Sequence, residues 1–322
     1  MQAVVFTRYG GPEQLQLSLR DKPVPEPGQV LLRVQAVALN DWDLQALKGT
    51  PFVNRVMFGL FKPHKQILGS DVVGVVEALG EGVTQFALGE TLVGDISGTW
   101  GGLAEYVCVS ESLLTVKPDT LSAVQAAALP QAGLLAQQGL FDVGRLLPGQ
   151  SMLINGAGGG VGCFAVQMAK QLGARVTAVD SANKLDGLLT LGADHVLDYQ
   201  TQDFTRLEER YDLVLDVKTN RLPSAYARAL KDGGVYVTVG GQIRHLLTLL
   251  VASPFYRWRH KRHLRIVALK PNSGIERLLN EVQAGRLQVQ VDHVYPLADT
   301  AEAFRRLDEA RHFGKVLVSV GQ

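Results

Sequence analysis

The feature that most constrains the fold is a glycine-rich turn between a short strand and a helix. Residues 151–154 are typical of a strand, and five glycines then fall within the seven positions 156–162. Apolar residues at steps of three and four follow from Val161 to Leu172, which indicates a helix. A strand, a glycine turn and a helix in this order present free backbone N–H groups and a positive helix end to a pyrophosphate. The stretch therefore predicts a dinucleotide-binding unit.

The turn departs in one place from the usual G-x-G-x-x-G pattern, because Ala157 stands first, before Gly159 and Gly162. The two glycines hold the places where the backbone touches phosphate and where the helix closes on the strand, so the alanine is a mild change. A second strand at 174–179 ends on Asp180, 18 residues after Gly162, where an acid is expected to bind ribose hydroxyls. The cofactor-binding residues predicted here are Gly156, Ala157, Gly158, Gly159, Gly160, Val161, Gly162 and Asp180.

The strand and helix patterns divide the 322 residues into two domains of an α/β protein. Residues 1–124 indicate a β-rich domain, with strands expected at 2–6, 29–37, 72–79, 91–94 and 104–109. Residues 125–285 alternate strands and helices and predict a doubly wound parallel sheet, with strands at 151–154, 174–179, 195–197, 211–216, 234–239 and 264–269. The last segment has strands at 293–297 and 315–320 around a helix at 299–310. Its pattern resembles that of the β-rich residues 1–124. We expect 286–322 to complete the first domain.

Composition is that of an ordinary globular protein, with 46% hydrophobic and 20% charged residues. A net charge of +1 gives no overall attraction to nucleic acid or membrane. The N-terminus lacks the apolar stretch of a signal peptide, and the apolar run at 246–252 is too short to span a bilayer. Cys108 and Cys163 are the only cysteines, so we expect reduced thiols and a cytoplasmic location.

Several further stretches carry a resemblance to a known family. They are Met1–Val5, Ala38–Asp43, Ile67–Asp71, Gly74–Gly80, Gly102–Tyr106, Ala126–Pro130, the glycine turn, Leu191–Tyr199 and Gly314–Val318. Over nearly its whole length the chain resembles the medium-chain dehydrogenase/reductase superfamily, and within it the zinc-free quinone oxidoreductases. The resemblance implies a GroES-like catalytic domain, a Rossmann domain, a cofactor cleft between them and a homodimer. It also implies cofactor contacts at Gly240 and Lys315.

The side chains at the family's zinc position predict that no metal is bound. Zinc-dependent relatives carry a cysteine near Asn40 and a Gly-His-Glu near Gly69, where this chain has Gly69-Ser70-Asp71. Neither a thiolate nor an imidazole is available there, and the four-cysteine lobe of such relatives is missing. His64 lies near in sequence, but a lone histidine in a surface loop is more often solvated than a ligand.

Lack of a zinc site favours one reaction class over another. An alcohol needs a Lewis acid to stabilise its alkoxide, whereas a quinone or an enone spreads the new charge by conjugation. We therefore predict reduction of quinones or α,β-unsaturated carbonyls, with Asn40 donating a hydrogen bond to the developing oxyanion. Asp43 either contributes to catalysis or caps a helix. The alternatives are metal-free alcohol dehydrogenase-like activity and a non-catalytic nucleotide-binding interaction protein.

The segment 52–61 is unusually apolar for a connection. It is predicted to line a hydrophobic substrate pocket, and the alternative is a short helix packed into the core. The pocket residues expected are Trp42, Met57, Phe58 and Phe61.

Three side chains give opposite predictions of whether the cofactor is NAD or NADP. Asp180 would repel a 2′-phosphate and favours NAD. Lys184 and Tyr199 match positions that hold the 2′-phosphate in NADPH-using quinone reductases, and a lysine is a plausible phosphate partner. We expect NADP, with NAD as the alternative.

A basic segment at 244–265 interleaves arginines, lysine and histidines with apolar and aromatic residues. Such a pattern occurs in single-stranded nucleic acid binders and in helices at membrane surfaces. The rest of the chain offers no supporting basic surface, so we expect a helix with solvated charges and neither a nucleic acid nor a membrane partner.

Overall fold

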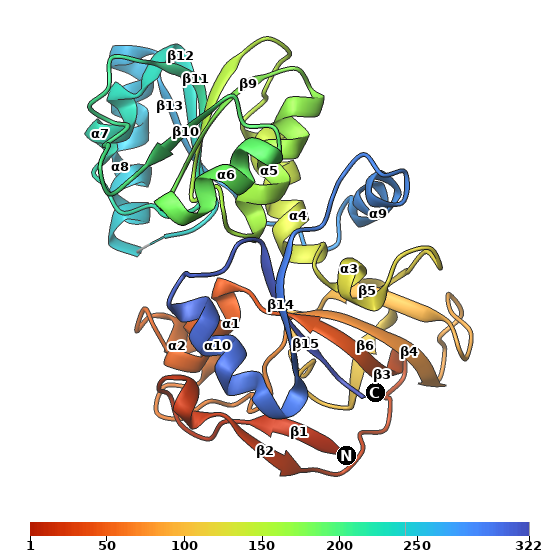
Figure 1. The fold of residues 1–322 in the computed structure, drawn as a ribbon. Helices are drawn as coiled ribbons and strands as arrows, with labels where there is room; N and C mark the ends of the chain where they lie inside the picture. The colour runs from red at the N-terminus through yellow and green to blue at the C-terminus, as the bar shows by residue number, and fades with distance from the viewer. Residues whose placement is uncertain (242, 322) are drawn as a thin grey trace. The chain divides into compact units, whose positions relative to one another are not determined.

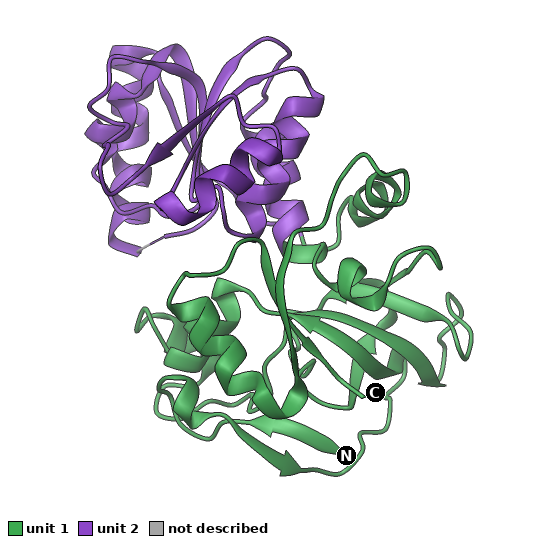
Figure 2. Cartoon of the chain, in the orientation of Figure 1, with its two compact units in different colours: residues 1–131, 271–322 green, residues 132–270 purple. Residues whose placement is uncertain are grey.

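The computed structural model describes residues 1–241 and 243–321, and in it the chain forms two compact units (Figures 1 and 2). Unit 1 comprises Met1–Gln131 and Pro271–Gln322, and unit 2 comprises Ala132–Lys270. The boundaries expected from sequence lay after residues 124 and 285 instead. The second boundary moves because Asn272 is held by unit 1, where its side chain exchanges two hydrogen bonds with the backbone of Asp95.

Unit 1 is built mainly of strands. Its strands are β1 (Gln2–Val5), β2 (Gln16–Leu19), β3 (Gln29–Ala38), β4 (Asp71–Leu79), β5 (Thr91–Asp95), β6 (Tyr106–Ser110), β7 (Thr115–Val116), β14 (Val291–Pro296) and β15 (Lys315–Ser319). Its helices are α1 (Asp41–Lys48), α2 (Asn54–Phe58), α3 (Ala123–Ala127), α9 (Ile275–Gln283) and α10 (Thr300–Asp308), with short turns at Pro12–Gln14, Glu111–Leu113 and Leu297–Asp299. Helix α4 (Pro130–Gln137) begins at the end of this unit's first segment.

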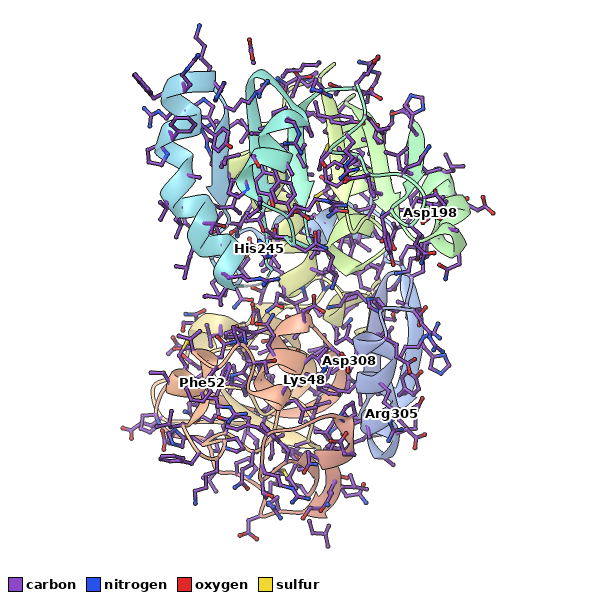
Figure 3. The ribbon with its side chains drawn as sticks, turned by 90° about the vertical axis from the view of Figure 1, so that its left-hand side faces the viewer. Lys48, Phe52, Asp198, His245, Arg305 and Asp308 are labelled. Carbon is purple, nitrogen blue, oxygen red and sulfur yellow. The ribbon has the colours of Figure 1, made fainter. Side chains whose placement is uncertain are left out.

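The main sheet of unit 1 has the order β14-β15-β3-β4-β5-β7, and β6 also pairs with β3. Strand β15, from the far end of the chain, therefore pairs directly with β3 of the first segment. Val and Leu side chains on β3 and β4 supply much of the core, since most of them are fully buried. Helices α1 and α10 touch, and Lys48 and Asp308 form an ion pair of 2.5 Å between them (Figure 3).

Unit 2 is a six-stranded parallel sheet in the order β10-β9-β8-β11-β12-β13. The strands are β8 (Ser151–Asn155), β9 (Arg175–Asp180), β10 (His195–Asp198), β11 (Tyr211–Asp216), β12 (Leu230–Thr238) and β13 (His263–Ile266). The helices are α5 (Gly160–Gln171), α6 (Leu185–Thr190), α7 (Pro223–Arg228) and α8 (Ile243–His260), with short helical turns at Gln138–Val143 and Ala182–Lys184. Figure 1 shows α5 and α6 on one face of the sheet and α7 and α8 on the other. This is the strand order of a Rossmann fold.

The strand and helix predictions are largely confirmed, and the exceptions have local reasons. Strand β12 begins at Leu230 rather than 234, because the chain pairs with β11 through Leu230 before an irregularity at Lys231–Gly234. The two-residue β7 and the edge strand β2 were not predicted, since β2 exposes most of its side chains and lacks a buried pattern. Among the described residues, no helix is long and apolar enough to cross a membrane.

Candidate functional site

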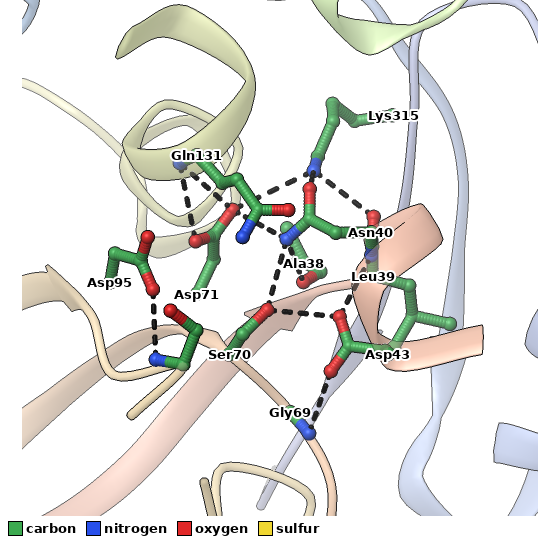
Figure 4. Close-up of polar contacts among 11 residues, drawn as sticks. Ala38, Leu39, Asn40, Asp43, Gly69, Ser70, Asp71, Asp95, Gln131 and Lys315 are labelled. Carbon is green, nitrogen blue, oxygen red and sulfur yellow. Dashed lines mark hydrogen bonds and ion pairs between the residues drawn. The ribbon is translucent and has the colours of Figure 1, made fainter. Parts of the chain in front are cut away.

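Sheet register in unit 1 brings polar residues from distant parts of the sequence to the same end of neighbouring strands. Leu317 on β15 lies opposite Ala38 on β3, Ala38 lies opposite Asp71 on β4, and Asp71 lies opposite Asp95 on β5. Residues next to these pairs share that end of the sheet. The result is a buried polar cluster of Asn40, Asp43, Ser70, Asp71, Asp95, Gln131 and Lys315 (Figure 4).

Asn40 is held at both ends of its amide. Its Oδ1 accepts a 2.6 Å hydrogen bond from the Nζ of Lys315, which also donates to the carbonyl of Leu39. Its Nδ2 donates to Asp71 Oδ2 at 2.9 Å and to Ser70 Oγ at 3.1 Å. Lys315 can only donate, so its contact identifies the oxygen end of the amide. Both amide hydrogens therefore have acceptors inside the cluster.

Asp43 ties helix α1 to the start of β4. Its carboxylate accepts hydrogen bonds from the N–H of Asn40 at 2.9 Å, from the Ser70 hydroxyl at 2.9 Å and from the N–H of Gly69 at 3.0 Å. The first of these bonds is the helix-capping contact that the sequence suggested as an alternative to a catalytic role. Burial raises the pKa of Asp43 to about 6, against the effect of its three donors.

Asp71 sits at the centre of the cluster and is completely buried. It accepts the N–H of Gln131, the second residue of α4, at 3.2 Å and lies 3.7 Å from the Lys315 ammonium. Burial raises the pKa of Asp71 to about 8; Lys315 opposes the rise and the charge of Asp95 adds to it. Burial also raises the pKa of Asp95 and lowers the pKa of Lys315. Three acids thus share one buried ammonium, which favours a proton on the Asp71 carboxyl near neutral pH.

The structure brings together only two of the four predicted pocket residues. Trp42 and Phe58 pack on each other with ring centroids 5.2 Å apart, and both contact Trp100. Met57 and Phe61 are instead exposed, at 69% and 89%. The segment does contain a short helix, α2, but none of its residues is fully buried, so neither interpretation of 52–61 holds in full. Trp100 was missed, although an aromatic residue inside a glycine-rich turn was a usable signal.

The glycine turn of unit 2 has the shape that the sequence predicts. At Gly162 a Cβ atom would lie 2.4 Å from the backbone of Ala157, so glycine is required for helix α5 to approach the strand end. At Gly159, the N-cap of α5, the nearest protein atom to a Cβ is 3.7 Å away. No atom of the described residues therefore fills the space at Gly159, and the N-terminal end of a twelve-residue helix opens there. This cradle fits the pyrophosphate of a dinucleotide.

Asp180 ends β9 beside this turn and is already engaged by the protein. Its carboxylate accepts the N–H of Gly158 at 2.7 Å and the N–H of Ser181 at 2.8 Å. Lys184 Nζ lies 3.3 Å from the same carboxylate, and both side chains are more than nine-tenths buried. Tyr199, also predicted to contact the cofactor, is half exposed, and its N–H donates a hydrogen bond to the carbonyl of Asp180. Asp180, Lys184 and Tyr199 therefore meet at one strand end.

A second buried network lies at the carboxyl ends of β8, β11 and β12. Asp216 accepts hydrogen bonds from Asn155 Nδ2 at 2.7 Å and from the Tyr236 hydroxyl at 2.6 Å. Gly240 follows β12, where its backbone exchanges hydrogen bonds with the Thr238 hydroxyl, and a Cβ there would meet open space. The sequence did not identify Asp216, although an acid ending a buried strand was visible. Lys315, predicted as a cofactor contact, lies instead in the buried cluster of unit 1.

Comparison with known proteins agrees with both units. Residues 26–119 match the family described as alcohol dehydrogenase GroES-like domain, and residues 191–318 match that described as zinc-binding dehydrogenase. The chloroplast envelope quinone oxidoreductase homolog of Arabidopsis thaliana is 31% identical, over 99% of this chain and 98% of the relative. The chloroplastic NADPH-dependent alkenal/one oxidoreductase of the same plant is 30% identical, over 99% and 79%. The chain belongs to the medium-chain dehydrogenase/reductase superfamily.

Solved structures of this superfamily place the chain in its quinone oxidoreductase-like group. The quinone oxidoreductase from Coxiella burnetii superposes with a TM-score of 0.87 at 28% identity, covering 100% of this chain and 99% of that one. An NAD-dependent alcohol dehydrogenase superposes with a TM-score of 0.84 at 33% identity, covering 100% of both chains.

The side chains of unit 1 do not fit the zinc ion that one family description mentions. Asn40 and Ser70 offer an amide and a hydroxyl where thiolate or imidazole would be needed. The Asp71 carboxylate already accepts hydrogen bonds from Asn40 and Gln131 and forms an ion pair with Lys315. The ammonium group of Lys315 also lies within the cluster, and its positive charge disfavours the binding of a metal cation there. These side chains therefore do not form a set of zinc ligands.

Proposed function

We propose that this protein transfers a hydride from a reduced nicotinamide dinucleotide to quinones or α,β-unsaturated carbonyl compounds. The proposal rests on two observations: unit 1 has a buried Asn40–Asp71–Lys315 network where zinc-dependent relatives carry metal ligands, and unit 2 has an intact dinucleotide turn. A conjugated acceptor delocalises the negative charge that it gains, so it needs hydrogen-bond donors rather than a Lewis acid.

The residues of the cluster have different parts in this reaction. The dinucleotide supplies the hydride when it is bound. Lys315 withdraws electron density from the Asn40 carbonyl oxygen, which strengthens the amide N–H as a donor. Asn40 then stabilises the developing oxyanion by exchanging one of its bonds within the cluster, and water delivers the proton. Asp43 positions Asn40 by capping α1.

For the cofactor we propose NADP, with NAD as the alternative. Asp180 is the residue that would repel a 2′-phosphate, but its charge is opposed by the Lys184 ammonium and by two backbone N–H donors. Tyr199 is exposed beside this pair and offers a further donor. An acid so engaged leaves the 2′ position less negative than a free carboxylate would.

We also propose a cytoplasmic homodimer. Strand β13 lies at the edge of the six-stranded sheet, where its unpaired backbone groups can join a second copy across a two-fold axis. Cys108 and Cys163 are not joined by a disulfide, which suits a reducing compartment.

A panel of acceptors tests the proposed function. We expect NADPH oxidation, followed at the nicotinamide absorbance band, with 9,10-phenanthrenequinone, 1,4-benzoquinone and a simple enone. Alcohol oxidation is the second candidate, because one similar structure is named an alcohol dehydrogenase. Turnover of simple alcohols, but of no quinone or enone, would favour that candidate. Tight dinucleotide binding without any turnover would favour a non-catalytic protein.

A further inference from the structure

Helix α8 has an apolar surface on the side that faces away from the core. His245 and Leu249 are buried, and partly buried Leu246 and Tyr256 pack with Leu249 on the core of unit 2. The opposite side exposes a second set of apolar side chains at helical spacing, with Val251 at 83% and Trp258 at 80% exposure. This apolar stripe consists of Ile243, Leu247, Leu250, Val251, Phe255 and Trp258.

Cationic side chains border the apolar stripe. At 100° per residue, Arg257 and Arg259 project to opposite sides of it. Arg244 lies at its first turn, and Lys261 and Arg262 follow the end of the helix. No aspartate or glutamate occurs from residue 243 to 270. Arg262 lies 3.6 Å from the exposed Asp232.

These charges decide which partner fits the stripe. A second copy docked by the same face across a two-fold axis would bring two cationic borders together, which is unfavourable. A single-stranded nucleic acid would need aromatic platforms, but four of the six stripe residues are aliphatic. An anionic lipid surface satisfies both features at once, because it accepts apolar side chains below its headgroups and binds cations at their level.

We propose that α8 docks the protein onto anionic lipid bilayers, with the apolar stripe inserted and its arginines at the phosphate level. The helix lies in the plane of the surface, since no helix in the described part of the chain can span a membrane. This revises the expectation, drawn from sequence, that the segment is only a solvated excursion. The inference rests on α8 alone and does not depend on the reaction that the protein catalyses.

Vesicle co-sedimentation of the full chain tests the proposal. We expect binding to vesicles of phosphatidylcholine mixed with phosphatidylserine, weaker binding as salt rises, and little binding to phosphatidylcholine alone. Val251→Glu with Trp258→Glu is expected to weaken binding at least about tenfold, because two carboxylates would enter the lipid. Arg257→Gln with Arg259→Gln is expected to weaken it about tenfold and to reduce its salt dependence. Trp258 fluorescence should shift to the blue with anionic vesicles.

The matched control is Leu19→Glu with Val24→Glu, which places two acids on exposed apolar positions of unit 1, at 76% and 82% exposure. It should bind vesicles as the unsubstituted protein does. Binding that survives the α8 substitutions, or that the control abolishes equally, would overturn the proposal. Dissociation of a dimer by Val251→Glu would assign the stripe to a second copy instead. Tight, salt-sensitive RNA binding without vesicle binding would assign it to nucleic acid.

Discussion

The glycine turn of unit 2 and the buried polar cluster of unit 1 bind and act by different means. The turn depends on the shape of its backbone, because Gly162 allows α5 to approach Ala157 and Gly159 leaves space at the helix N-terminus. In the cluster, side chains from three strands, two helix starts and the residue before β4 lie together, and Lys315 reaches Asn40 across 275 positions of sequence. The turn is a local device, whereas the cluster depends on the register of a whole sheet.

This difference predicts different responses to substitution. A local backbone device should fail by steric clash and lose ligand binding. A buried charge network should fail electrostatically, so its failure should depend on pH.

The largest effect is expected at Lys315. Lys315→Met removes the ammonium that faces Asp71 and leaves the carboxyl groups of the cluster without it. Breaking a buried ion pair costs about 3 to 5 kcal/mol, so the free energy of unfolding should fall by about that much at pH 8. Urea unfolding measures it. The control is Lys48→Met, which breaks the part-exposed pair with Asp308 and should cost less than about 1 kcal/mol. An equal loss of unfolding free energy in the two variants would show that the buried Lys315 pair is worth no more than a part-exposed one.

Gly162→Ala should come next. The new Cβ would lie 2.4 Å from backbone atoms of Ala157, which cannot move aside as a flexible side chain can. We expect a loss of about 3 kcal/mol in stability and at least tenfold weaker dinucleotide binding, measured by calorimetric titration. Gly98→Ala, where a Cβ meets nothing within 4 Å, should change neither. Unchanged binding in Gly162→Ala would contradict the assignment of the turn.

The pH dependence of stability distinguishes the cluster from the turn. The folded pKa of Asp43 is raised to about 6 and that of Asp71 to about 8, above the ordinary value of about 3.9. The stability tied to a raised carboxyl pKa is present below about pH 4 and is lost as pH rises through the folded pKa. The free energy of unfolding should therefore fall by about 2 kcal/mol or more between pH 5 and 8. Asp71→Asn should flatten this fall, and a fall of the same size in that variant would exclude Asp71 as its source.

The smallest expected effect concerns cofactor choice at the edge of the turn. Lys184→Met leaves Asp180 without its ammonium partner, so the 2′-phosphate of NADPH should be repelled. We expect the ratio of NADPH to NADH affinity to fall about tenfold, which corresponds to about 1.4 kcal/mol. Lys170→Met, which breaks the part-exposed pair with Asp194 in the same unit, is the control for loss of one positive charge. An unchanged ratio of NADPH to NADH affinity would mean that Lys184 pairs with Asp180 and has no effect on the 2′-phosphate.

The elements around the turn could be predicted because their signals are local. Strands β8 and β9, helix α5 and the acid Asp180 follow one another within 30 positions, and each has its own apolar period or turn chemistry. The sequence could also indicate that Asn40 and Asp43 stand at a helix start, since the capping contact spans only four consecutive residues.

The rest of the cluster could not be predicted, because sheet register brings it together. Nothing near Lys315 in the sequence indicates that β15 pairs with β3, or that Asp95 lies opposite Asp71. The sequence also could not show which apolar side chains are exposed to solvent. Met57 and Phe61 are apolar, as pocket residues are, but both are exposed. The sequence showed that apolar and basic residues alternate along α8, but it could not show which apolar side chains are buried against unit 2 and which form the exposed stripe.

We infer that a network of protein groups takes the place of a metal in the reduction of conjugated acceptors. The most direct test of this inference is the rate of NADPH oxidation with 9,10-phenanthrenequinone after exhaustive chelation, with the zinc content of the same sample measured by mass spectrometry. We predict an unchanged rate in a sample free of zinc. Loss of activity on chelation, with recovery when zinc is added back, would contradict the claim.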